Sequence, residues 1–307
     1  PRSVHTVVAR AGRFLLATTL AAALAPALAA GVVAYRAAHP PRRPPTRTPA
    51  DLGLPLETVR FLTADRVPIT AWLIPPRNGR IVVYLHGIGG NREQLLDRAA
   101  ALAAHGYGAL LLDLRAHGES GGTTTSFGVR EAHDVTAALR FLRARYPSAR
   151  LGALGVSLGG AAALFAASQT PHVEALVVDS AFAALEPAVR KRMGELTGLP
   201  SWLGGLVVRW AEWQTGVKAA AVAPLEVVER IAPRPLLLIH GEDDRLFPVD
   251  EHAVPLYRRA GEPRALWTVA GADHAAPYVV APETYVERVR GFFDRSLGRE
   301  PPEPPMS

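Results

Sequence analysis

The 307-residue sequence contains no cysteine, which removes several kinds of chemistry at once. Without cysteine there is no disulfide, no thiolate ligand for zinc and no cysteine nucleophile. The HExxH, GxGxxG and GxxxxGK patterns are also missing, so metalloprotease, dinucleotide and phosphate-loop chemistry have no support. We therefore expect no metal and no cofactor, and a reaction that the chain's own groups carry out.

Acidic residues are missing from the first 50 positions, which hold seven arginines. The rest of the chain carries 27 basic and 28 acidic side chains, so the net charge of +6 belongs to the N-terminus. A nucleic-acid-binding domain needs clustered cations on the domain itself. We expect no nucleic-acid partner.

Charge is absent altogether from residues 14–35, which follow three arginines. A helix of this length spans roughly 33 Å, enough to cross a bilayer. Residues 1–36 therefore predict a basic N-terminus with a signal anchor, which would hold the rest of the chain at the extracytoplasmic face of a membrane. The alternative is a signal peptide cleaved near Ala29, which would give a secreted protein. A buried core helix is a third reading, with little to pack against.

Proline is concentrated on both sides of the main domain. Residues 37–50 contain five prolines and predict an extended, semi-rigid stalk in the polyproline II conformation. The last nine residues, 299–307, have no apolar face to bury and predict a disordered tail. The domain itself is expected over residues 51–298.

Apolar, β-rich runs alternate with helical patterns along this domain. The later runs are nearly continuous in hydrophobicity, as expected for parallel strands covered on both faces. The first two runs have no helix between them and predict an antiparallel edge hairpin at the N-terminal side. The predicted fold class is α/β, a mostly parallel, doubly wound sheet. The expected strands are 56–62, 69–74, 80–86, 107–114, 149–156, 174–180, 235–241 and 265–271, and the expected helices are 91–105, 128–145, 158–169, 250–260 and 281–297.

Residues 181–224 interrupt this alternation and predict a small helical cap over the sheet edge. The segment holds three of the five tryptophans, Trp202, Trp210 and Trp213. Two interpretations stay open for these aromatic side chains. They either pack the insertion onto the domain or line a pocket for an acyl or aromatic group.

Ser157 lies in the stretch LGALGVSLGG, between an expected strand and an expected helix. Ligands of open α/β sheets bind beyond the carboxyl ends of the strands, and this serine is at such an end. Gly155 and Gly159 fit a tight strand–turn–helix, the nucleophile elbow of α/β hydrolases. The start of the helix then supplies partial positive charge and free N–H groups for a developing anion.

A serine nucleophile needs a base, and the base needs an orienting acid. Two other strand ends carry candidates for these roles. The stretch LLLIHGEDDRLFP offers Asp243 and Asp244, and VAGADHAAP offers His274. The chain order serine, acid, histidine is the order found in α/β hydrolases.

With these motifs the chain resembles serine hydrolases of the α/β-hydrolase superfamily. It is similar to membrane-anchored α/β-hydrolase-domain esterases and to serine-aminopeptidase-like members, over about residues 55–297. The resemblance implies the α/β-hydrolase fold, His274 as base and Asp244, rather than Asp243, as acid. It rests on HGIGGN (86–91), DLRAHGES (113–120), GVSLGG (155–160), HGEDDRLFP (240–248) and GADH (271–274).

The resemblance also implies an oxyanion hole made of the backbone N–H groups of Ile88 and Leu158. His86 and Gly87 would shape this loop, and His86 and His240 are expected to serve structure beside the strand ends. The predicted function is hydrolysis of a carboxylic ester through an acyl-enzyme on Ser157. A serine aminopeptidase-like peptidase and an acyl-thioesterase are the enzymatic alternatives, with a small acyl compound or a short peptide as substrate. A non-catalytic, membrane-attached binding module, attached through residues 14–35, is the alternative from another class.

Overall fold

The computed structural model describes residues 2–197 and 200–298, so the predicted tail at 299–307 lies outside the described part of the chain. Its strands are β1 (Glu57–Leu62), β2 (Pro68–Ile74), β3 (Arg80–Leu85), β4 (Gly108–Leu112), β5 (Arg150–Val156), β6 (Ala175–Asp179), β7 (Leu236–Gly241) and β8 (Arg264–Val269). They form one sheet in the order β1-β2-β4-β3-β5-β6-β7-β8. β1 and β2 are antiparallel, β2 and β4 are antiparallel, and all later neighbours are parallel. The predicted fold class and edge hairpin are confirmed.

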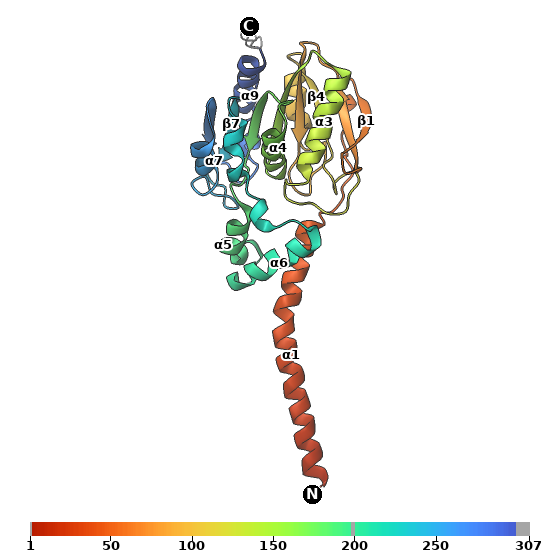
Figure 1. Ribbon diagram of the computed structural model, residues 1–307, viewed down its shortest axis with the longest axis vertical. Coiled ribbons are helices and arrows are strands. Elements are labelled where there is room, and N and C mark those ends of the chain that lie inside the picture. The colour runs from red at the N-terminus through yellow and green to blue at the C-terminus, as the bar shows by residue number, and fades with distance from the viewer. Residues whose placement is uncertain (1, 198–199, 299–307) are drawn as a thin grey trace, which may run out of the picture.

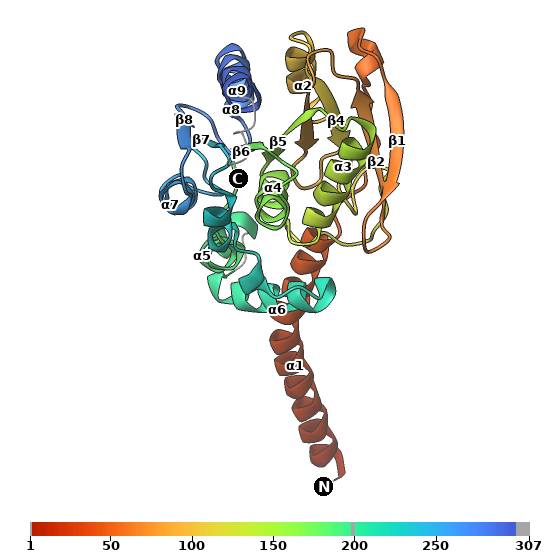
Figure 2. The ribbon, with the colours of Figure 1, turned by 45° about the horizontal axis from the view of Figure 1, so that its top comes forward.

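Helices cover both faces of this sheet (Figure 2). Neighbouring side chains of a strand point to opposite faces, so Val83 and Leu85 of β3 enter one apolar core and Val82 and Tyr84 enter another. The first core is closed by α3, α4 and α7, and the second by α2 and α9. The helices of this body are α2 (Leu96–Ala103), α3 (Glu131–Arg145), α4 (Leu158–Gln169), α7 (Ala253–Arg259), α8 (Pro277–Val280) and α9 (Pro282–Leu297). Short 3₁₀ turns are found at Pro49–Leu52, Pro224–Glu226 and Val228–Ile231.

The cap follows β6 and lies at the carboxyl edge of the parallel strands, below the sheet in Figure 1. It consists of α5 (Leu185–Thr197), α6 (Gly204–Thr215) and 3₁₀ turns at Ser201–Leu203 and Ala219–Ala221. Trp210 and Trp213 line an open groove between the cap and α1, where Trp210 lies against Gly31. Trp202 and Trp213 are 64% and 76% exposed, and Trp210 stacks edge-on against Trp213.

The first helix, α1 (Arg2–Ala38), projects away from the domain at its N-terminal end and packs on the cap at its C-terminal end (Figure 1). Ala30 and Ala34 are fully buried against Leu203 and Val207. Small side chains four residues apart on one helix face permit this close approach. The helix therefore does have something to pack against, contrary to our expectation. No helix within the described residues is long and apolar enough to cross a membrane. Attachment to a membrane stays a prediction.

The proline-rich linker does not stand free as a stalk. Residues 39–48 run over the carboxyl edge of the body, where the Arg42 guanidinium donates to the Ser120 carbonyl. Further along, Arg47 forms an ion pair of 2.7 Å with Asp97 at the start of α2. The expectation of a separate stalk was wrong because the linker's arginines find carbonyl and carboxylate partners on the domain.

Candidate active site

Ser157 occupies the tight turn between β5 and α4. Its backbone has φ +51° and ψ −112°, a conformation that residues with side chains rarely adopt. The turn depends on two glycines, because a Cβ at Gly155 would lie 2.3 Å from the Gly159 carbonyl oxygen and one at Gly159 would lie 2.2 Å from that of Leu85. The sharp turn holds the serine at the first turn of α4, at the carboxyl edge of the sheet.

The folded chain brings Ser157 together with two residues from distant strand ends. His274 Nε2 lies 3.0 Å from the Ser157 hydroxyl oxygen, and His274 Nδ1 lies 2.8 Å from an oxygen of Asp244. The Asp244 carboxylate is buried, whereas the His274 side chain is 20% exposed. The Phe247 ring packs edge-on against the imidazole, with 5.2 Å between ring centroids. The imidazole can therefore accept a proton from the serine hydroxyl while Asp244 fixes the proton on Nδ1.

Asp244 is held as a carboxylate by more donors than His274 alone. Burial by itself raises its pKa, but hydrogen bonds from His240 and His274 hold the pKa of Asp244 well below its ordinary value. His240 Nε2 lies 3.1 Å from the same oxygen that faces His274, and the Phe247 N–H donates to the other oxygen at 2.7 Å. The His240 Nε2–H also donates to the Phe247 carbonyl at 2.6 Å, so His240 braces the turn that holds the acid, in keeping with the structural role expected for it. Its spacing of four residues before Asp244 is the signal that points to it.

The two expected oxyanion donors come from the loop that follows β3 and from the first residue of α4. The N–H groups of Ile88 and Leu158 donate to no group within the described residues, and Leu158 is the first residue of α4, where the N–H has no partner inside the helix. His86 Nδ1 donates to the Gly87 carbonyl at 2.7 Å. A trans peptide points its C=O and N–H in opposite directions, so this bond also fixes the direction of the Ile88 N–H. Gln94 Oε1 accepts from the Gly87 N–H at 2.7 Å and fixes the preceding peptide.

Acid should weaken the fold through His86, which is fully buried. Burial, helped by the neighbouring His117, lowers the pKa of His86 to about 3. Its Nε2 accepts the Leu114 N–H at 3.0 Å, so protonation there breaks this bond. Between pH 6.5 and pH 3 the unfolded chain binds a proton that the folded chain does not. Stability therefore falls as pH falls through this window, by about 1.4 kcal/mol per pH unit.

We expect acidification from pH 7 to pH 4 to cost the wild type about 3 kcal/mol more than it costs His86→Gln, in urea unfolding. The variant keeps His117, so the difference in acid-induced loss of stability between the two proteins reports the protonation of His86. An equal acid sensitivity in both proteins would contradict the assignment of this loss to His86.

Asp179 and Ser180, at the end of β6, support the site and were missed from the sequence. The Asp179 carbonyl accepts the Ser157 N–H at 2.8 Å, and the Ser180 hydroxyl accepts the Ala275 N–H at 3.2 Å, next to His274. The Asp179 carboxyl receives hydrogen bonds from Ser180 and Tyr285, and burial raises its pKa. The pair directly follows a parallel strand, so the strand-end rule that found Ser157 also applies to it.

Other polar residues near these strand ends stay apart from the serine. His117 stacks edge-on against His86, with 4.8 Å between ring centroids, and Asp243 faces solvent. His133 lies on the half-exposed face of α3. Within the described residues no three histidine, aspartate or glutamate side chains gather as they would around a metal ion.

The strand order and the turn at Ser157 together define an enzyme of the α/β-hydrolase class. Comparison with known proteins leads to the same class, since residues 76–225 match the family described as serine aminopeptidase, S33. The chain belongs to the α/β-hydrolase superfamily and is a hydrolase.

Particular relatives extend over most of the chain. It is 30% identical to the Bacillus subtilis protein YqkD over 252 residues, which covers 76% of this chain and 82% of YqkD. The Escherichia coli (strain K12) protein YfhR is 26% identical over 228 residues, 71% of this chain and 73% of YfhR. A solved structure of the Pyrococcus furiosus esterase Pf2001 superposes with a TM-score of 0.72 at 30% identity, covering 84% of this chain and 100% of the esterase.

Proposed function

We propose that the chain is a serine hydrolase that cleaves carboxylic esters through an acyl-enzyme on Ser157. The observation that carries the proposal is the continuous line of hydrogen-bond contacts from Ser157 through His274 to Asp244, at 3.0 Å and 2.8 Å. A nucleophile, a base and an orienting acid at these separations are what acyl transfer requires.

In this mechanism the Ser157 oxygen attacks the ester carbonyl while His274 Nε2 takes the hydroxyl proton. The carbonyl oxygen becomes an oxyanion, and the N–H groups of Ile88 and Leu158 stabilise its charge. His274 then gives its proton to the alcohol that leaves, and the acyl group stays on Ser157. Water attacks the acyl-enzyme with the same histidine as base, which releases the acid and restores the serine. Asp244 keeps the Nδ1 proton in place throughout.

The comparisons point to two substrate classes, an ester for Pf2001 and a peptide for the serine aminopeptidase family model. The family match at 76–225 ends before both Asp244 and His274. Pf2001 is matched over its whole length, at 30% identity. This wider match favours the ester, and the peptide is the second candidate.

The proposal is tested by comparing p-nitrophenyl acyl esters with aminoacyl p-nitroanilides on the full chain. We expect kcat/KM for the best ester to exceed that for the best anilide at least 100-fold, and a fluorophosphonate probe to label the protein stoichiometrically. Faster cleavage of the anilides would favour the peptidase. Absence of both turnover and labelling would leave the binding module as the function.

A further inference from the structure

Glycine is frequent in the loop that follows β3, which carries the expected oxyanion donor, the Ile88 N–H. We call residues 87–91 the oxyanion loop, and three of them are glycines, namely Gly87, Gly89 and Gly90. Gly89 has φ +71°, a conformation that residues with side chains rarely adopt. Glycines give a chain segment more conformational freedom than other residues do. This loop therefore needs hydrogen bonds from its surroundings to hold one N–H group in one direction.

The Gln94 side chain supplies such a bond from the turn before α2. Its Oε1 accepts the Gly87 N–H at 2.7 Å. A Cβ at Gly90 would lie 2.7 Å from the same oxygen, so the amide lies against the inside of the loop and leaves no room there for another side chain. Gln94 itself is exposed, so substituting it removes this bond and little buried packing.

Gly87 is held through both of its peptide groups. Gln94 accepts its N–H, and its carbonyl accepts from His86 Nδ1 at 2.7 Å and from the Gly90 N–H at 3.1 Å. With both peptide planes held, the two backbone dihedral angles of Gly87 are set. The trans peptide that follows then gives the Ile88 N–H one direction.

The same glycine lies between Gln94 and the nucleophile. A Cβ at Gly87 would lie 3.7 Å from the Ser157 Cβ and 3.7 Å from Gln94 Oε1. A change in the φ of Gly87 therefore moves the Ile88 N–H relative to the carbon that the serine attacks. Without the Gln94 acceptor, His86 still holds the Gly87 carbonyl, so we expect the donor to tilt rather than to be lost.

We propose that Gln94 is a positioning residue for ester hydrolysis, which aligns the Ile88 N–H with the developing oxyanion by holding the Gly87 N–H. The proposal rests on the function proposed above. Full charge on the substrate oxygen exists only in the transition states and tetrahedral intermediates, so a tilted donor slows the reaction without weakening substrate binding equally. Removing a whole oxyanion donor costs about 10²- to 10³-fold in kcat, and a tilted one should cost less.

Three substitutions separate the acceptor oxygen of Gln94 from the rest of its side chain. Gln94→Ala and Gln94→Met both remove the acceptor, and methionine keeps the length of the chain. We expect each to lower kcat for p-nitrophenyl acetate about 10- to 30-fold, with KM changed less than about twofold, because acylation and deacylation both pass through an oxyanion. Gln94→Glu keeps an oxygen for the Gly87 N–H and should retain kcat within about threefold.

The affinity for a trifluoromethyl ketone gives a second readout. Such a ketone adds to Ser157 and forms an oxyanion without being cleaved, so it resembles the tetrahedral intermediate. Its inhibition constant should rise about 10- to 30-fold in Gln94→Ala and Gln94→Met, in proportion to the fall in kcat/KM. In Gln94→Glu it should change less than about threefold.

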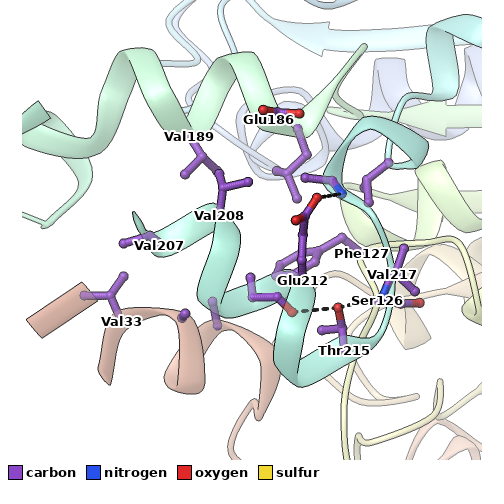
Figure 3. Close-up of a pocket in the computed structure, with 16 residues that line it drawn as sticks. Val33, Ser126, Phe127, Glu186, Val189, Val207, Val208, Glu212, Thr215 and Val217 are labelled. Carbon is purple, nitrogen blue, oxygen red and sulfur yellow. Dashed lines mark hydrogen bonds between the residues drawn. The ribbon is translucent and has the colours of Figure 1, made fainter. Parts of the chain in front are cut away.

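Glu212→Met is the matched control. Glu212 lies in the cap and accepts the N–H of Ala219, seven residues away, at 2.9 Å (Figure 3), and Gln94 accepts the N–H of Gly87, also seven residues away. The half-open apolar pocket that Glu212 lines includes no residue of the triad or of the oxyanion loop. The control therefore loses an acceptor for a backbone N–H elsewhere in the fold, and it should keep kcat and the inhibition constant within about twofold.

Unchanged kcat in Gln94→Ala and Gln94→Met, with an active wild type, overturns the role of Gln94 and leaves the proposed function standing. An unchanged inhibition constant in these variants, an equal loss of kcat in Gln94→Glu, or the same loss in Glu212→Met overturns that role as well. A wild type that hydrolyses no ester overturns the proposed function, and the role of Gln94 with it.

Discussion

Replacing Ser157 with alanine should lower kcat for p-nitrophenyl acetate by about 10⁵- to 10⁶-fold. Among the described hydrogen bonds, the Ser157 hydroxyl is the group that faces His274 Nε2, at 3.0 Å, so the variant has a base but no nucleophile. The residual rate would come from the oxyanion donors and from substrate binding. Labelling by a fluorophosphonate probe should disappear, as measured by intact mass.

Ser168→Ala is the matched control for this experiment. Ser168 belongs to the same helix, α4, and its hydroxyl donates to the Phe165 carbonyl at 2.8 Å, far along the helix from the turn. We expect this control to keep full activity and labelling. Thermal unfolding should be similar in both variants, because among the described residues the Ser157 hydroxyl is bonded to the His274 side chain alone. Retained labelling of Ser157→Ala would show that another residue reacts.

The sheet could be predicted closely because its strands are buried on both faces. A continuous apolar run such as that of β5 leaves little choice of structure, and all eight expected strands are present. Helix starts were less accurate, since the helix expected at 91–105 begins only at Leu96. The preceding residues instead form a loop in which Gln94 holds Gly87, a contact that hydrophobic periodicity does not record.

The placement of α1 could not be predicted from its composition. Its 22 uncharged residues predict an apolar helix, but the contact with the cap depends on Ala30, Ala34 and Ala38, a stripe of small residues at every fourth position. That stripe shows which face packs closely and does not show the partner, which lies about 170 residues away in the sequence. The packing of α1 on the cap therefore could not be predicted from the sequence.

The candidate site could be predicted where its residues obey one rule, namely that ligands of open α/β sheets bind beyond the carboxyl ends of the strands. Ser157, Asp244 and His274 each follow a parallel strand, so they meet at one edge of the sheet. The same rule points to Asp179, which sequence reasoning passed over because no motif marks it. His240 was treated as structural, since its approach to the Asp244 carboxylate depends on the turn at the end of β7.

Asp244→Asn should lower kcat by about 10⁴-fold, the size of loss that follows when a triad histidine is held in the wrong tautomer. Both oxygens of Asp244 act as acceptors, one for the Phe247 N–H and the other for His274 Nδ1, beside His240. An asparagine has a single acceptor oxygen, so its NH₂ group must face one of these donors. With the oxygen towards Phe247, the NH₂ faces His274 and forces its proton onto Nε2, where it blocks proton transfer from Ser157.

Asp243→Asn provides the matched control, because Asp243 is the exposed neighbour of Asp244 and changes charge in the same way. We expect it to retain activity within about twofold, a surface charge contributing little. The comparison separates the effect of a lost negative charge near the site from that of the lost acceptor. If both variants lost activity equally, long-range charge would be the cause. If Asp243→Asn alone were inactive, the acid would be Asp243, and the contact between Asp244 and His274 would serve the fold rather than the reaction.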